Sequence, residues 1–108
     1  DKTRRLPLRA PVLIAVGVDK PGAPNIIESE NLEAAAAACE NLLLAAHALG
    51  LAGMWRTGEW ASDAKVKEFL GFAADQYIAA FLYIGEPELV PEYAPRPGFE
   101  DRTVWMEE

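Results

Sequence analysis

The chain has 108 residues, of which 51% are hydrophobic and 25% are charged. This length and composition predict one globular domain rather than a disordered segment. The formal net charge of −7 repels phosphate backbones and anionic lipids, which argues against nucleic acid and membrane surfaces as main partners.

Cysteine and histidine occur once each, as Cys39 and His47. A single cysteine forms no intrachain disulfide, and one cysteine with one histidine is too few for a zinc site built from protein side chains. No signal peptide and no membrane-spanning run is recognisable in the sequence. We therefore expect a cytoplasmic protein without a metal site.

The first predicted element is a strand. The segment "APVLIAVGV" at 10–18 is a continuous apolar run rich in β-branched residues, which predicts a strand that is buried on both faces. Pro21, Gly22 and Pro24 follow and predict a loop.

A long helix is predicted from about Ser29 to Leu49. Ser29 or Asn31 is expected to cap its start, and Gly50 is well placed to end it in a left-handed conformation. The segment "AAAAACENLLLAAHALG" within this region is apolar almost all the way round. A helix without a polar face is buried in a large core or in a subunit interface, so the pattern predicts an oligomer.

The stretch "GLAGMWRTGEW" at 50–60 gathers two tryptophans, an arginine and glycines in one short connection. Residue types leave two interpretations open. In the first, the tryptophans fill the core and Arg56 lies on the surface. In the second, the segment faces a ligand: Trp55 covers an aromatic ring, Arg56 holds a phosphate or a ring carbonyl, and Thr57 donates a hydroxyl hydrogen bond. Trp60 is assigned to the structural interpretation.

A short amphipathic helix comes next, with Ser62 or Asp63 as its cap, Val66, Phe69 and Leu70 on its apolar side and Gly71 at its end. "YIAAFLYIG" at 77–85 predicts a second buried strand. The proline-rich tail from Glu86 onward is too irregular for a helix or strand. Its apolar residues predict that it wraps over the chain's own body or over a neighbour; these are Tyr93, Phe99, Val104 and Trp105.

The sequence contains no recognisable nucleotide-binding fingerprint or catalytic triad. No glycine-rich nucleotide-binding fingerprint follows the first strand, so a Rossmann or P-loop protein is not indicated. The two serines, Ser29 and Ser62, are interpreted as helix caps rather than nucleophiles. His47 is interpreted as a core or interface histidine rather than a catalytic base.

Four blocks of the sequence carry a resemblance to a known family. They are "RAPVLIAV" at 9–16, "AAAAACENLLLAAHALGLAGMWRTG" at 34–58, "VKEFLG" at 66–71 and "FLYIGEP" at 81–87. In this order they resemble the FMN-dependent nitroreductase family, and most closely its small NAD(P)H nitroreductase branch. The resemblance covers nearly the whole chain, with "PRP" at 95–97 included.

The resemblance implies an α+β fold, a mixed sheet flanked by helices, and an intertwined homodimer with FMN at its interface. It implies FMN contacts at Trp55, Arg56 and Thr57, and a phosphate contact at Arg96. It further implies a nicotinamide-nucleotide segment; this corresponds to Ala45, Ala46, His47, Ala48, Leu49 and Gly50.

The implied activity is hydride transfer from NAD(P)H through FMN to a small-molecule electron acceptor, such as a nitroaromatic or a quinone, in a ping-pong sequence. The family's N-terminal segment that grips the FMN phosphate has no counterpart in this sequence, which begins with Asp1. We therefore expect residues 1–108 to be the C-terminal part of a single nitroreductase-like domain. The alternative is a non-catalytic flavin-binding or degenerate half-domain that serves as an assembly partner.

Overall fold

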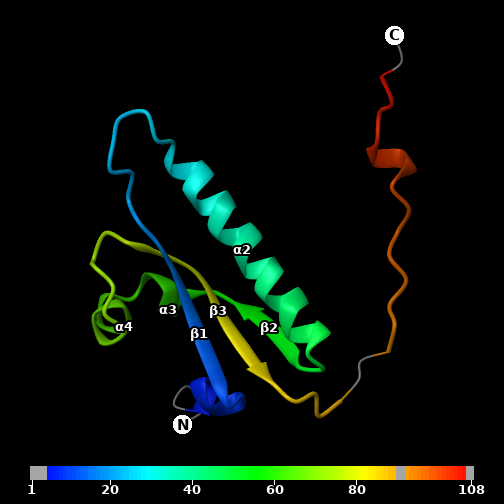
Figure 1. Ribbon diagram of the computed structural model, residues 1–108, viewed down its shortest axis with the longest axis horizontal. Helices are drawn as coiled ribbons and strands as arrows, with labels where there is room; N and C mark the ends of the chain where they lie inside the picture. The colour runs from blue at the N-terminus through cyan, green and yellow to red at the C-terminus, as the bar shows by residue number, and fades with distance from the viewer. Residues whose placement is uncertain (1–4, 90–91, 107–108) are drawn as a thin grey trace.

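The fold is α+β and is built around one antiparallel sheet of three strands, in the order β1 (Val12–Val18), β3 (Tyr77–Gly85) and β2 (Ala52–Arg56) (Figure 1). The computed structural model describes residues 5–89 and 92–106, so that Asp1 lies outside the described part. The remaining elements are η1 (Leu6–Arg9), α2 (Glu28–Ala48), α3 (Glu59–Ser62), α4 (Ala64–Phe69) and η2 (Glu100–Arg102).

The central strand β3 has the bounds that the apolar run predicted. It is buried along most of its length, and Ile78 and Leu82 are fully inaccessible to solvent. A strand that is paired on both sides and has most of its side chains buried contains few positions that face water, which explains the unbroken apolar sequence.

The first strand is less buried than predicted. It pairs only with β3, so within the described residues it is an edge strand, and most of its side chains are partly exposed. The prediction of burial on both faces is wrong for this structure because an apolar run does not show whether a strand has one neighbour or two.

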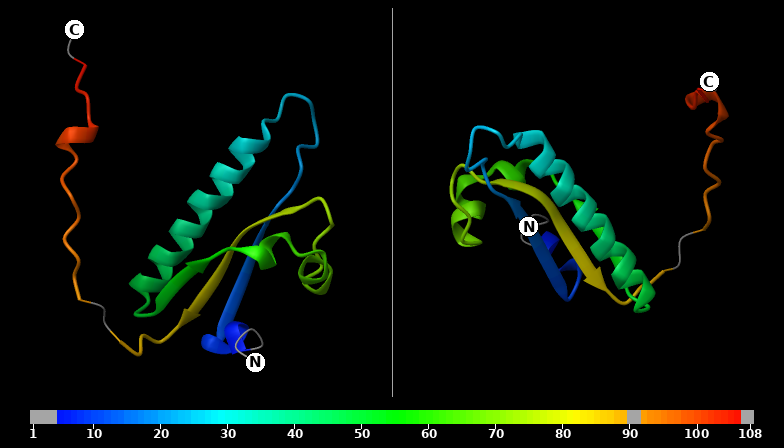
Figure 2. Two further views of the ribbon diagram at one scale, coloured as in Figure 1. Left: turned by 180° about the vertical axis from the view of Figure 1, so that it is seen from behind. Right: turned by 45° about the horizontal axis from the view of Figure 1, so that its top comes forward.

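One face of the sheet is covered by α2, which crosses it obliquely (Figure 2). Cys39 and Ala46 of the helix are buried against Ala80, Leu82 and Ile84 of β3. These β3 residues alternate along the strand, so they share one face of it. The core therefore lies between α2 and one side of the sheet.

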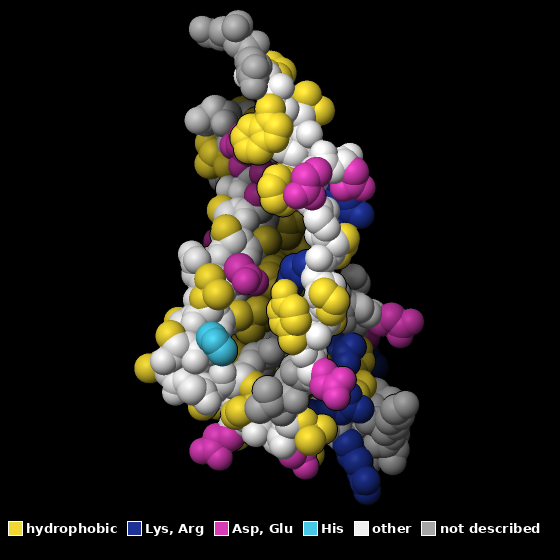
Figure 3. Space-filling model, turned by 90° about the vertical axis from the view of Figure 1, so that its right-hand side faces the viewer, with side chains coloured by type: hydrophobic (Ala, Val, Ile, Leu, Met, Phe, Trp, Pro, Cys, Tyr) yellow, Lys and Arg dark blue, Asp and Glu magenta, His cyan; other side chains and the backbone are white. Residues whose placement is uncertain are grey.

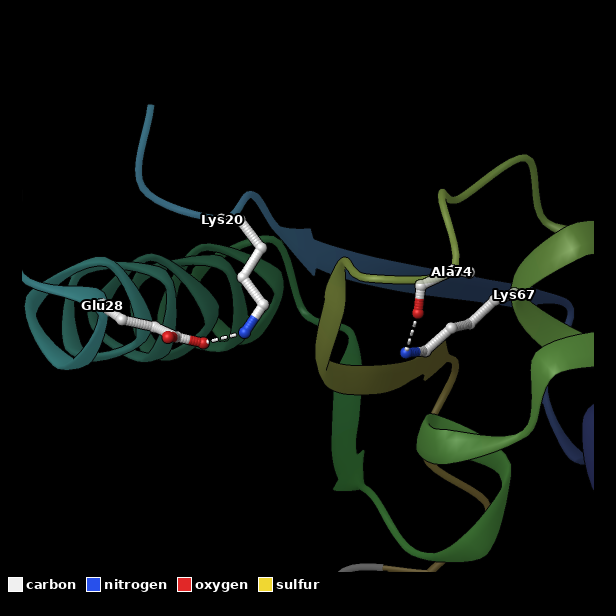
Figure 4. Close-up of polar contacts among 4 residues, drawn as sticks. All are labelled: Lys20, Glu28, Lys67 and Ala74. Atoms are coloured by element: carbon white, nitrogen blue, oxygen red, sulfur yellow. Dashed lines mark hydrogen bonds and ion pairs between the residues drawn. The ribbon is translucent and has the colours of Figure 1, made fainter. Parts of the chain in front are cut away.

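The helix begins without the predicted cap. Its N-cap residue is Ile27, which makes no side-chain capping bond, and Ser29 and Asn31 already belong to the helix. Glu28 and Glu30 instead place negative charge beside the free N–H groups of the first turn. Lys20 of the preceding loop contacts Glu28, which ties the loop to this helix end (Figure 4).

The end of α2 confirms the role of Gly50. Its φ of 76° is left-handed, its N–H donates to the His47 carbonyl at 2.9 Å, and the Leu51 N–H donates to the Ala46 carbonyl at 2.9 Å. This pair of bonds is a Schellman motif, which favours glycine because the conformation is strained for residues with a Cβ.

The short helix α4 is capped by the predicted Asp63, whose Oδ1 accepts hydrogen bonds from the N–H groups of Lys65 and Val66. Ser62 is not a cap, because it is the last residue of α3. Phe69 does not line a buried side and is 87% exposed. The side chain of Lys67 donates to the Ala74 carbonyl at 3.1 Å and steadies the turn before β3 (Figure 4).

The tail beyond β3 extends away from the sheet and helices, and all views show it apart from them (Figures 1 and 2). Its apolar side chains are exposed, including Tyr93 and Trp105. Figure 3 shows hydrophobic side chains along this side of the molecule. The described part of the tail, residues 86–89 and 92–106, therefore does not wrap over the chain's own body, and contact with a neighbour stays a prediction.

Candidate functional site

A cavity of about 670 Å³ lies on the face of the sheet opposite α2. This volume is within the range of roughly 300–1,000 Å³ that small-molecule sites occupy. The cavity is lined by Leu6, Arg9, Ala10, Pro11, Ala52, Gly53, Met54, Arg56, Thr57, Glu59, Trp60, Phe81, Tyr83, Gly85 and Glu86.

Strand alternation decides which side chains of β2 reach the cavity. Met54 and Arg56 pair with Tyr83 and Phe81 of β3, and all four line the cavity. Trp55 lies between Met54 and Arg56, so its side chain projects to the other face. The cavity floor is therefore aromatic, and its rim at β2 carries a cation.

Arg56 has most of its donors available. Its Nε–H donates to the Met54 sulfur at 3.2 Å, and sulfur is a weak acceptor. It forms no ion pair with a carboxylate among residues 5–89 and 92–106. A guanidinium in this state can bind a phosphate or a ring carbonyl in two-point contact.

The backbone leaves the sheet directly after Arg56. Thr57 follows, and Gly58 then adopts φ 107° and ψ −159°, a conformation that is open almost only to glycine. The chain turns here into α3, which packs on β3 and supplies Glu59 and Trp60 to the cavity. Because β2 is an edge strand in the described sheet, one row of its backbone polar groups faces away from β3.

The structure separates the two tryptophans of the stretch 50–60. Trp55 packs against the core between α2 and the sheet and does not line the cavity. Trp60, which sequence reasoning assigned to a structural role, does line it. Trp55 therefore fits the first interpretation, whereas Arg56, Thr57 and Trp60 line a cavity, and their contact with a ligand stays a prediction.

The remaining predicted site residues lie elsewhere. Residues 45–50 form the last turn and end of α2, on the other side of the sheet from the cavity; of these only Ala46 is buried. His47 is exposed, so it is not a core histidine in this structure. Arg96 is exposed in the tail and does not line the cavity.

Sequence reasoning missed several cavity residues, including Arg9, Glu59, Phe81 and Tyr83. The alternation of side chains along β3 could have predicted that Phe81 and Tyr83 share one face. Leu82 faces α2, so its neighbours Phe81 and Tyr83 must face the opposite side of the sheet. Nothing in the sequence alone places Arg9 beside them, because that contact depends on the pairing of β1 with β3.

The chain's only cysteine, Cys39, is buried on the side of α2 that faces the sheet, and this burial raises the pKa of its thiol. Within the described ranges, no three side chains are grouped as metal ligands. Among the same residues, no helix has the length and apolarity needed to cross a membrane.

Comparison with known proteins identifies the family to which this sheet, long helix and cavity belong. The model of the nitroreductase family matches residues 1–86, and the chain belongs to this family. Among curated proteins, the NAD(P)H nitroreductase YdjA of Escherichia coli K12 is 34% identical over 89 residues, which are 82% of this chain and 49% of YdjA. YdjA of strain O157:H7 matches equally well. The chain thus spans about half the length of the curated relatives it matches.

Solved structures share the fold. A nitroreductase-like family protein from Bacillus cereus matches with a TM-score of 0.82 and 23% identity, over 99% of this chain and 60% of that one. A nitroreductase from Desulfovibrio desulfuricans, solved in complex with FMN, matches with a TM-score of 0.70 and 28% identity, over 89% of this chain and 55% of that one. These matches confirm the predicted family and fold class.

Proposed function

We propose that this chain is part of an FMN-dependent NAD(P)H oxidoreductase that reduces an electron-poor small molecule, such as a nitroaromatic or a quinone, in a ping-pong sequence. Membership of the nitroreductase family supports the class of reaction. The FMN bound in the Desulfovibrio relative supports the cofactor, and the name of YdjA supports the nicotinamide donor. The observation that carries the proposal is the placement of Arg56 and Thr57 at the rim of the cavity.

The residues that line the cavity fit a flavin. Its volume of about 670 Å³ is large enough for a ligand of this size. Phe81, Tyr83 and Trp60 offer apolar and aromatic surface for a flat ring, while Arg9 and Arg56 offer positive charge for a phosphate or a ring carbonyl. This combination of a flat apolar floor with a few polar groups is typical of cofactor sites.

Each residue of the β2 end has a role in this proposal. The Arg56 guanidinium binds an anionic or carbonyl oxygen, and the Thr57 hydroxyl donates a hydrogen bond. A backbone N–H at Arg56 or Thr57 would donate a hydrogen bond to the flavin ring and would stabilise negative charge on it. FMN itself supplies the hydride chemistry when it is bound. No side-chain nucleophile is needed.

The other predicted cofactor contacts stay within the proposal. Trp55 contributes through its backbone, because its ring lies behind the sheet. Arg96 and the segment 45–50 lie away from the cavity of this chain, so they can contribute only to a site that a second subunit shares.

We infer a homodimer from the apolar surface that this chain leaves uncovered. Leu44 and Leu49 of the α2 region are exposed, and so are Tyr93 and Trp105 of the tail. Burial of such a surface against a second copy would remove it from water and complete the predicted wrapping of the tail.

The second candidate function is that of a non-catalytic flavin-binding or degenerate half-domain that acts as an assembly partner. The colour of the purified protein separates the two functions. An enzyme is expected to be yellow with FMN and to be bleached by NAD(P)H, whereas a chain that binds FMN without bleaching is non-catalytic.

Thr57→Pro tests the proposed donor, since proline has no N–H. We expect this variant to bind FMN more weakly and to be reduced more slowly by NAD(P)H than the unmodified chain. Unchanged binding together with an unchanged rate of hydride transfer would exclude a role for the Thr57 N–H.

A further inference from the structure

Ala79 lies in the central strand but has no register partner in either neighbouring strand. The register of β1 passes from Ala80 directly to Ile78, so a β-bulge skips Ala79. The register of β2 ends opposite Phe81, which leaves Ala79 beyond the last paired residue. Ala79 is nevertheless buried, with 6% of its surface exposed, and a buried backbone carbonyl requires a hydrogen-bond partner.

The side chain of Trp55 supplies that partner. Its indole Nε1–H donates to the Ala79 carbonyl at 3.3 Å. This bond links β2 to β3 past the point where the backbone pairing of the two strands ends. The indole has a single N–H donor, so the contact uses all of its hydrogen-bonding capacity.

The ring of Trp55 is held from the α2 side. It pairs with Leu82 across the strands and packs against the core cluster that includes Cys39 and Ala46. Arg56, the next residue, projects into the cavity on the opposite face. A ligand in the cavity therefore meets Arg56 directly but cannot touch the Trp55 ring.

We propose that Trp55 is a positioning residue: its indole fixes the point at which β2 leaves the sheet and thereby holds Arg56 and Thr57 against the cavity. Neither Thr57 nor Gly58 belongs to the register of β2, so strand pairing does not fix them. The Trp55–Ala79 bond takes the place of the missing pairing. The positioning itself is a property of this chain, and only its consequence for FMN depends on the proposed function.

The test compares Trp55→Phe with Leu43→Val in the full 108-residue chain. Trp55→Phe keeps an aromatic ring and removes the N–H donor. Leu43→Val removes a methylene from the same core cluster but leaves the bond to Ala79 intact, so it controls for a loss of packing. Urea denaturation of both variants measures how much stability each one loses.

Nuclear magnetic resonance gives a readout that needs no flavin. We expect the backbone order parameters of Thr57 and Gly58 to fall from about 0.85 to below roughly 0.6 in Trp55→Phe, and to stay unchanged in Leu43→Val. Order parameters that are the same in both variants and in the unmodified chain would overturn the positioning role.

FMN titration then tests the consequence at the site. We expect Trp55→Phe to weaken FMN binding roughly three- to tenfold, which is the scale of one hydrogen bond, and Leu43→Val to leave it unchanged. Equal affinities of Trp55→Phe and the unmodified chain, or equal losses in the two variants, contradict the proposal. If the unmodified chain binds no FMN, the proposed function fails for this chain, while the order parameters still decide whether Trp55 positions the segment.

Discussion

Trp55 and Arg56 are neighbours in the chain, but their side chains lie on opposite faces of the sheet. Trp55 packs toward α2 and donates to the Ala79 carbonyl at 3.3 Å, whereas Arg56 lines the cavity. Strand alternation thus divides a run of three residues that the family resemblance assigns to one ligand: one side chain packs into the core, and the next lines the cavity. This relationship connects the stability of the core with the geometry of the candidate site.

Gly58 is predicted to be intolerant of a side chain for conformational reasons. A Cβ at this position would meet no atom within 4 Å, but φ is 107°. Gly58→Ala should therefore lower the free energy of unfolding by about 1–3 kcal/mol, measured by urea denaturation. Gly22→Ala is the matched control, because its Cβ also meets nothing and its φ is not left-handed; it should be nearly neutral. Equal stabilities of the two variants would show that the turn after β2 relaxes freely.

Gly53 is predicted to be intolerant for steric reasons. A Cβ there would overlap Leu43 Cδ2, since α2 approaches β2 closely at this point. Gly53→Ala should destabilise the chain by about 1–3 kcal/mol. Leu43→Ala should relieve part of this cost, so the double variant should be more stable than the sum of the single losses predicts, by on the order of 1 kcal/mol. Additive losses in urea denaturation would mean that the two residues do not touch.

Cys39 is predicted to be unreactive in the folded chain. It is 1% exposed, and burial raises the pKa of its thiol, so little thiolate is accessible at neutral pH. Iodoacetamide should label it only as fast as the chain unfolds, with a rate that rises through the urea transition. Because the folded state holds the thiol proton more tightly than the unfolded state, this group stabilises the fold below its ordinary pKa. That contribution is lost as the pH rises through the raised value. Rapid labelling without urea would contradict the burial of Cys39.

The inferred homodimer predicts a specific effect of charge on the outer face of α2. Leu44→Asp should shift the chain toward the monomer in light scattering coupled to size-exclusion chromatography, because Leu44 is exposed in the single chain and apolar. Phe69→Asp introduces the same charge at an exposed apolar position on α4 and should leave the mass unchanged. A monomeric unmodified chain, or equal masses of the two variants, would contradict an interface through α2.

The parts of the fold that the sequence predicted well are those fixed by local pattern. β3 is an unbroken apolar run and has the predicted bounds, and Gly50 and Asp63 end and begin helices as their residue types indicate. The capping prediction at the start of α2 was wrong. Glu28 and Glu30 place negative charge beside the free N–H groups of the first turn, and no side chain caps the helix.

The candidate site was harder to predict because it depends on strand parity and pairing. Sequence reasoning grouped Trp55 with Arg56, while the alternation of β2 separates them. It assigned Trp60 to the core, while the turn at Gly58 directs α3 toward the cavity. Arg9 comes from a distant part of the chain, and only the tertiary pairing of β1 with β3 brings it to the same cavity.

FMN titration of the unmodified chain, Arg56→Ala and Arg102→Ala, followed by the quenching of flavin fluorescence, tests most directly whether the β2 rim is a flavin contact. Arg102 is an exposed arginine of η2, so its removal changes the charge equally but away from the cavity. We expect saturable binding that Arg56→Ala weakens roughly tenfold and Arg102→Ala leaves unchanged, since a charge-assisted hydrogen bond is lost only at the rim. No saturable binding by the folded chain, or the same affinity in all three proteins, would contradict the assignment of Arg56 to the flavin site.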